Sequence, residues 1–434
     1  MMRRATAHLA DVTPLRESAD FRRLWLGGAL SGMGSRMKAV AVAVQIYALT
    51  HSSLAVGLEG LFIAVPLIAV GLLGSSLVDA VDRRRLVIGT GSALAIVSLL
   101  FAAQAYLNLG VAGLLYALVA VQSSLVAIDQ PARRTFAPRL LAPERLTSAS
   151  ALSFLSFQVS MIVGPLFAGV LIAASGYQIV YAVDAATFLT ALYPVFRLPP
   201  MPVLGRHTSG GFGAVLGGLS YVVHQPVLRS LLLADLNGMV FGMPWALFPA
   251  LAATRYGGVQ TVGWLYAAPA FGGLLAAAFS GRVSRVRRQG MAVLISIGVW
   301  GAAVAAFGFS SSLMPAVLML AIAGGADVVN GVFRTTILQL APPDALRGRV
   351  NAVGYVVGAG GPQVGNIEAG IVASLTSAVI SAISGGVACV IGVGIIAVTM
   401  PALGRYRPEA LEEPRDVVAA ATALEALEVG ESTD

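Results

Sequence analysis

Twelve apolar runs, each of about 20 residues or slightly more, follow one another along the chain. An α-helix of about 20 apolar residues crosses the roughly 30 Å hydrocarbon layer of a membrane. Only 11% of the residues are charged, less than half the share of about 25% in a soluble domain. We therefore expect an all-α membrane protein with twelve transmembrane helices. The expected spans are 24–49, 54–78, 86–107, 110–130, 147–174, 177–196, 228–253, 260–280, 290–309, 314–335, 350–374 and 379–401.

The basic residues alternate between the connections of these spans. The connections on one side hold nearly all of them: Arg83, Arg84, Arg85, Arg133, Arg134, Arg139, Arg145, Arg197, Arg206, Arg229, Arg282, Arg285, Arg287, Arg288, Arg334, Arg347 and Arg349. The connections on the other side hold Arg255. Because basic connections stay in the cytoplasm, we expect a multi-pass protein of the cytoplasmic membrane with both termini inside. The net charge of +7 follows from this topology, so no nucleic-acid partner is expected.

The two halves of the sequence repeat each other in the same orientation. Arg134-Thr135 and Arg334-Thr335 are 200 positions apart, Pro66 and Pro269 are 203 apart, and Gly164-Pro165 and Gly361-Pro362 are 197 apart. These offsets predict two six-helix bundles related by a pseudo-two-fold axis. The expected parts are an N-terminal segment (1–20), a first bundle (21–197), a cytoplasmic linker with a short surface helix (198–227), a second bundle (228–404) and an acidic cytoplasmic tail (405–434).

The connection between the second and third spans carries acids next to a run of arginines. Its candidate residues for a cytoplasmic gate are Asp79, Asp82, Arg83 and Arg84. An acid at a helix end beside arginines can latch this face when the two halves close and release it when they part. The alternative is that the arginines only fix the topology. The segment resembles the signature loop of the major facilitator superfamily, with Ser75 and Asp82 in place of its two glycines, and this resemblance assigns gating to the Asp79–Arg83 pair.

Three further segments resemble one branch of that superfamily, the bacterial enterobactin-exporter and macrolide-efflux-like group. They are residues 129–133, 181–188 and 347–350, and the acid at position 82 is also typical of this branch. The resemblance extends from Phe21 to about Arg405. It implies the major facilitator fold and a transporter that exports small molecules.

The fifth span contains Gly164, Pro165 and Gly169. Proline removes a backbone hydrogen bond, and glycine lets a neighbouring helix lie close. The segment resembles the Gly-Pro-x-x-Gly-Gly motif of antiporters, with Ala168 in place of one glycine, and this resemblance implies export by antiport. Ordinary helix packing is the alternative, and it is compatible with the first reading.

Charged residues inside the predicted spans are the candidates for cargo binding or proton coupling. They are Arg36, Glu59, Asp184, Asp235, Asp327 and Glu368, and Lys38 lies beside Arg36. Such residues cost at least about 2.5–3.5 kcal/mol to insert and by default mark function, although structural ion pairs are the alternative. The fourth span has no arginine between Leu114 and Ile128. The arginine that better-known drug antiporters use for coupling is therefore missing there, and Arg36 is its expected substitute.

The sequence thus predicts a secondary transporter that exports a small amphiphilic, antibiotic- or siderophore-like molecule by alternating access and proton antiport. The expected partners are the cargo, protons and the lipid bilayer, and we expect a monomer. An importer coupled to protons or sodium is the alternative. A membrane-embedded enzyme is a remote one, because the four histidines are scattered and no phosphate-binding loop occurs. We expect no metal and no cofactor.

Overall fold

The computed structural model describes residues 11–73, 81–201, 212–278 and 286–407. These residues form helices and short connections, with no β-strand among them. Within the described ranges, ten helices are long and apolar enough to cross a membrane. Two more, α2 and α17, are 32 residues long but more polar. The structure thus has the predicted all-α membrane architecture, and the count of twelve spans stays a prediction.

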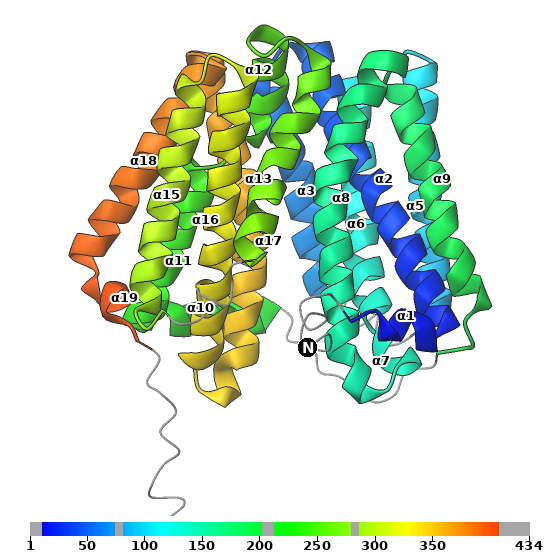
Figure 1. The fold of residues 1–434 in the computed structure, drawn as a ribbon, viewed down its shortest axis with the longest axis horizontal. Helices are drawn as coiled ribbons and strands as arrows, with labels where there is room; N and C mark the ends of the chain where they lie inside the picture. The colour runs from blue at the N-terminus through cyan, green and yellow to red at the C-terminus, as the bar shows by residue number, and fades with distance from the viewer. Residues whose placement is uncertain (1–10, 74–80, 202–211, 279–285, 408–434) are drawn as a thin grey trace, which may run out of the picture.

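Figure 1 shows two groups of helices side by side, each formed by one half of the chain. The first group contains α1 (Thr13–Glu17), α2 (Ala19–Thr50), α3 (Ser53–Leu73), α5 (Arg83–Tyr106), α6 (Ala112–Arg134), α7 (Ala137–Leu140), α8 (Leu146–Ser175) and α9 (Tyr177–Arg197). The second contains α11 (Pro226–Phe241), α12 (Phe248–Thr254), α13 (Val262–Ala278), α15 (Gln289–Phe309), α16 (Leu313–Leu340), α17 (Asp344–Leu375), α18 (Ala378–Thr399) and α19 (Pro401–Arg405).

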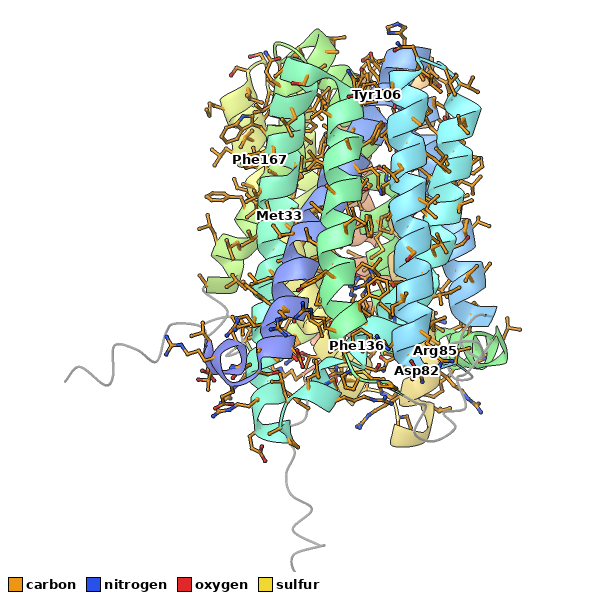
Figure 2. All side chains as sticks on the ribbon, turned by 90° about the vertical axis from the view of Figure 1, so that its right-hand side faces the viewer. Met33, Asp82, Arg85, Tyr106, Phe136 and Phe167 are labelled. Carbon is orange, nitrogen blue, oxygen red and sulfur yellow. The ribbon has the colours of Figure 1, made fainter. Side chains whose placement is uncertain are left out.

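We call one side of the molecule the basic end, because α5 begins there at Arg83 and α6 ends there at Arg134. Asp82 and Arg85 lie at this end and Tyr106 lies at the opposite end (Figure 2). Helix α10 (Phe212–His224) also lies at the basic end, across the second group (Figure 1). It packs on the start of α17, where a Cβ added to Gly218 would lie 2.2 Å from the carbonyl oxygen of Arg349.

The span predicted over 228–253 lies within the candidate span Pro226–Thr254, but its helix is interrupted. Helix α11 ends at Phe241, and the chain resumes as a short 3₁₀ turn and α12. The break begins at Gly242, whose carbonyl oxygen accepts a hydrogen bond from Trp300 Nε1 at 2.8 Å. The amide of Ala246 donates to Asn366 Oδ1 at 3.2 Å. A broken helix is tolerated at membrane depth when neighbouring side chains satisfy the freed backbone groups, as these two do.

The two groups of helices touch mainly through two pairs, α3 with α17 and α8 with α13. Glycines bring the backbones together at both. A Cβ at Gly57 would lie 2.3 Å from the carbonyl oxygen of Asn366, and one at Gly169 would lie 2.8 Å from that of Gln260. Both contacts lie in the half of the helices near the opposite end, so the molecule is closed there.

Candidate functional site

Asp235 is the centre of a polar cluster in the second group of helices. It lies in α11, nine residues and so roughly 14 Å from the first residue of that helix. The residue is 6% exposed. Asn330 Nδ2 of α16 donates to Asp235 Oδ1 at 3.2 Å. Arg334, one turn further along α16, forms an ion pair with Asp235 Oδ2 at 3.6 Å. We call these three residues the Asp235 cluster.

The Asp235 cluster borders a cavity of about 190 Å³. Helices α11, α16 and α17 form most of its wall, and Thr335 and Asn351 add polar groups to it. The Arg334 side chain is 30% exposed. A buried carboxylate therefore shares an open space with a guanidinium, an arrangement that can hold a small charged group.

Asp327 gives this region a second carboxylate. It lies on the same face of α16 as Asn330 and Arg334, and it is exposed. The described part of this region thus holds two carboxylates, those of Asp235 and Asp327, and one guanidinium, that of Arg334, which pairs with Asp235. One negative charge is therefore left without an ion pair. That excess charge can be neutralised by a proton or by a group on a bound molecule.

The other predicted charges lie apart from this cluster. Glu59 is 9% exposed and Glu368 is partly buried, and neither forms a hydrogen bond or ion pair with a described residue. Arg36 faces α8, where its Cζ lies 5.4 Å from the ring centroid of Phe157. The structure shows no ion pair between Arg36 and Glu59, Asp235 or Glu368. Arg36 remains a cation without a carboxylate partner in the described chain.

Asp184 lies in the core of the first group of helices, away from the cavity. Its Oδ2 lies 2.5 Å from Lys38 Nζ, and the two side chains are 0% and 2% exposed. Ser98 Oγ donates to the same carboxylate at 2.6 Å and accepts from Lys38 at 2.9 Å. This cluster joins α2, α5 and α9, so the structure places Asp184 in an internal ion pair.

The described residues of the predicted gating loop contact their own half of the chain. Asp82 caps α5, with its Oδ1 accepting from the amide of Arg85 at 3.0 Å. Arg83 is buried, and its amide donates to the carbonyl of Met201. Arg84 donates to the carbonyls of Val195 and Phe196, the last turn of α9, where a cation also favours the helix dipole. Asp79 lies outside the described residues, and the gating role stays a prediction.

The residues of the antiporter-like motif lie at two helix crossings. A Cβ at Gly164 would lie 2.7 Å from Cβ of Arg36, so Gly164 lets α8 approach α2 within one half. Pro165 and Gly169 instead face α13 of the other half. A Cβ at Gly263 would lie 2.4 Å from the carbonyl oxygen of Pro165. The motif therefore makes close contacts both inside the first half and between the halves.

The sequence repeat relates these contacts to those of α3 with α17. The offset of 203 takes Gly60 to Gly263, and the offset of 197 takes Leu166 to Gln363. Gly60 is packed against Gln363, as Gly263 is against Leu166. The same offsets take Gly57 to Gln260 and Gly169 to Asn366. The contact of Gly57 with Asn366 therefore corresponds to the contact of Gln260 with Gly169. In the first of these two contacts the glycine lies on α3, whereas in the corresponding contact it lies on α8, the counterpart of α17.

The sequence identified Asp235 but not the residues that complete its cluster. Asn330 and Arg334 follow Asp327 by three and seven positions on one helix, and the structure joins both of them to Asp235 on a second helix. The sequence repeat could have indicated that Arg334 has a special position. Arg334 is the counterpart of Arg134, yet it lies further inside its helix, six residues before the end of α16, whereas Arg134 ends α6.

Comparison with known proteins gives a family and several relatives. The sequence family described as "transmembrane secretion effector" matches residues 9–421. The enterobactin exporters EntS of Shigella boydii serotype 18 and of Escherichia coli strain SE11 are each 25% identical over 400 residues. These residues cover 92% of this chain and 96% of either exporter.

Solved transporter structures share the fold. A POT family transporter in complex with 5-aminolevulinic acid has a TM-score of 0.71 at 10% identity, covering 89% of this chain and 97% of its own. A bacterial homologue of the iron transporter ferroportin, in an inward-facing state, has a TM-score of 0.65 at 15% identity and covers 89% and 99%. At such identities the similarity shows the fold alone.

Proposed function

Because the chain belongs to the transmembrane secretion effectors of the major facilitator superfamily, we propose that it exports a small amphiphilic molecule in exchange for protons. It is a secondary transporter related to enterobactin exporters, and its relatives and structural neighbours are transporters rather than enzymes. We also propose that the chain crosses the membrane twelve times and that its two bundles are related by a pseudo-two-fold axis.

The observation that carries the coupling is the unequal charge around the Asp235 cluster. Asp327 lies on the same face of α16 as Arg334, which pairs with Asp235, so one carboxylate can exchange a proton while the other keeps an ion pair. Burial of Asp235 beside a cavity lets cargo and proton compete for the same group. Such competition is the physical requirement of antiport, because a bound cargo then expels the proton.

The orientation follows from the charges. The positive-inside rule places the basic end in the cytoplasm, and hence both termini. The close glycine contacts at the opposite end then correspond to a state that faces the cytoplasm, the state in which an exporter takes up its cargo. We propose export across the inner membrane by a monomer.

The cargo class rests on one further residue. Arg36 has no carboxylate partner among the described residues, and its guanidinium lies over Phe157. A cation beside an exposed aromatic ring favours an amphiphile that carries an anionic group. The related exporters carry enterobactin in their name, and we propose a siderophore-like or antibiotic-like cargo.

The test uses everted membrane vesicles whose lumen is acidified and contains a dye quenched by the pH gradient. A cargo that enters the lumen in exchange for protons restores fluorescence. We expect recovery with anionic catecholate siderophores or macrolides, and a rate at least ten-fold lower with Asp235→Asn. Asp20→Asn, an exposed acid outside the cavity, is the matched control.

A second assay separates coupling from folding. Asp235→Asn should still exchange labelled cargo for unlabelled cargo without a proton gradient, because that exchange needs no net proton transfer. Accumulation of the same cargo by intact cells, without dye recovery in vesicles, would establish the importer instead. Full gradient-driven transport by Asp235→Asn would move the coupling to another carboxylate.

A further inference from the structure

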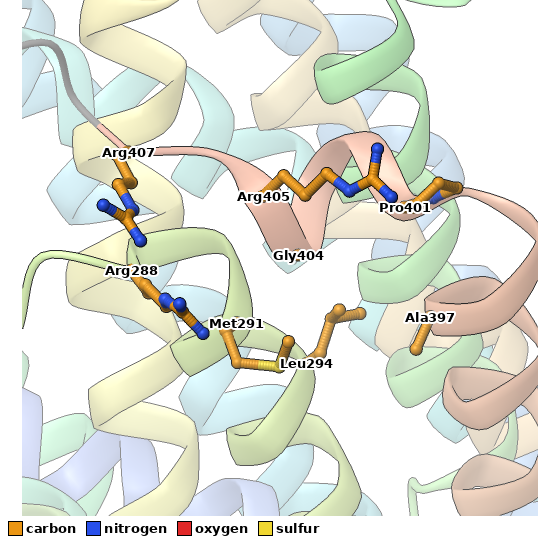
Figure 3. Close-up of a pocket in the computed structure, with 8 residues that line it drawn as sticks. All are labelled: Arg288, Met291, Leu294, Ala397, Pro401, Gly404, Arg405 and Arg407. Atoms are coloured by element: carbon orange, nitrogen blue, oxygen red, sulfur yellow. The ribbon is translucent and has the colours of Figure 1, made fainter.

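A second cavity, of about 410 Å³, lies at the basic end, between the start of α15 and the end of α18 (Figure 3). It is separate from the Asp235 cluster. Arg288 precedes the first residue of α15, and Arg405 and Arg407 belong to the segment that begins with α19. Met291, Leu294 and Pro401 form apolar parts of the wall.

The three arginines make this cavity strongly cationic. All three are exposed, and none forms an ion pair with a residue that the structure describes. A guanidinium binds phosphate oxygens through two parallel hydrogen bonds and is weakly hydrated, so it suits a phosphate at an apolar boundary. Two of the arginines lie two residues apart and the third approaches from another helix, so a phosphate between them would meet cations from two elements.

The position of the cavity identifies the source of the phosphate. Helix α15 begins at Gln289 and α18 ends at Thr399, so the cavity lies where two candidate spans end, at the level of the lipid head groups. Between the cavity and the opposite end of the molecule, both helices expose apolar side chains. These are Ile295, Val299, Ile391, Ile395 and Val398, which are 40–81% exposed. A lipid with its head group in the cavity would therefore have an apolar surface next to its acyl chains.

We propose that this cavity binds an anionic phospholipid, with its phosphate held by Arg288, Arg405 and Arg407 and its acyl chains lying along α15 and α18. Basic residues next to a span attract anionic lipid, and here three converge on one cavity. The bound lipid would hold the end of α18 against the start of α15. The site thus makes the second group of helices sensitive to the charge of the inner leaflet.

The test is native mass spectrometry of the full-length protein, first stripped of lipid in detergent. Titration with phosphatidylglycerol should produce a bound adduct at a concentration at least ten-fold lower than phosphatidylcholine needs. The Arg288→Gln/Arg405→Gln variant should lose this preference. Arg229→Gln/Arg287→Gln removes the same charge from exposed positions that do not line the cavity, and it should keep the preference.

Three outcomes would overturn the proposal. The first is equal loss of lipid binding in both double variants, which would indicate a general charge effect. The second is binding of inorganic phosphate as tight as that of the lipid, which would make the site one for a soluble anion. The third concerns the acids that follow Arg407 in the sequence. If lipid binds only when Glu409, Glu412 and Glu413 are changed to Gln, these acids occupy the cavity in place of the lipid.

Discussion

At the scale of single residues, the pair of Lys38 and Asp184 has the clearest consequence for stability. Both side chains are almost fully enclosed, and Ser98 forms a hydrogen bond with each of them. An ion pair withdrawn from solvent is costly to break, because removing one partner leaves the other charged and uncompensated. Phe101 and Phe188, whose rings lie within 6 Å of Lys38 Nζ, would compensate that charge only in part.

We expect Asp184→Asn to destabilise the protein by about 3–5 kcal/mol, the usual cost of breaking a buried ion pair. The double variant Lys38→Met/Asp184→Leu should recover most of this loss, because no charge then stays buried. Chemical unfolding in detergent micelles, followed by circular dichroism, measures both. If Asp184→Asn instead kept its stability and lost gradient-driven transport, Asp184 would be a coupling residue.

The sequence could predict which charges lie in the membrane, but not which of them meet. Arg36 and Lys38 are two positions apart, about 200° around a helix, so the two side chains cannot face the same partner. The structure agrees, with Arg36 toward α8 and Lys38 in the core of its own half. The identity of each partner depends on how the neighbouring helices are rotated, and single-sequence apolar patterns leave that rotation open.

At the scale of helices, the break between α11 and α12 depends on Trp300. Its indole N–H donates to the carbonyl oxygen of Gly242, and a Cβ at Gly242 would lie 2.4 Å from that nitrogen. The carbonyl has no helical partner at this point. Only glycine leaves room for the indole that satisfies it.

We expect Trp300→Phe to destabilise the second group of helices by about 1–2 kcal/mol, because a ring without N–H leaves the Gly242 carbonyl unsatisfied. Trp264→Phe is the control, since Trp264 is 49% exposed and has no hydrogen bond in the described chain. Thermal unfolding of the two purified variants measures the difference. Equal midpoints would contradict the role given to the indole.

The glycine crossings between the halves allow a second test. Alanine at Gly57 or Gly169 would place a methyl group within 3 Å of a backbone oxygen, so the opposite end could no longer close fully. We expect each variant to transport at least ten-fold more slowly at a normal expression level. Gly113→Ala meets no atom within 4 Å and should transport normally; an equal defect there would attribute the effect to helix propensity.

The positions of the helices were predictable from apolar length, but the break was not. Proline was no guide, because six prolines lie inside continuous helices of this structure: Pro66, Pro131, Pro165, Pro194, Pro269 and Pro362. What distinguishes Gly242–Pro244 is a donor on a neighbouring helix. That donor comes from Trp300, 58 positions away, and the local sequence gives no sign of it.

At the scale of the whole molecule, transport requires the two halves to separate at the opposite end after they close at the basic end. Gly60 and Gln363 face each other across this closed contact, with a Cβ at Gly60 placed 3.0 Å from Cβ of Gln363. We expect Gly60→Cys/Gln363→Cys to form a disulfide on oxidation and to stop transport, with recovery after reduction. Undiminished transport by the cross-linked protein would contradict alternating access at this interface.

The sequence predicts a parallel repeat and two halves, but it could not predict which end of the molecule is closed. The pattern of hydrophobicity shows which helix faces are apolar, but it does not distinguish an inward-open from an outward-open arrangement of the helices. Which end closes depends on contacts such as that of Gly57 with Asn366, and these are made by backbone atoms.

The exchange of glycine between Gly57 and its counterpart contact at Gly169 has a consequence for how such proteins are compared. Each crossing requires one residue without a side chain, and either helix can supply it. A loss on one helix can therefore be compensated by a gain on its partner. The constraint belongs to the pair, so an alignment scored one column at a time would count two equivalent solutions as a mismatch at both positions.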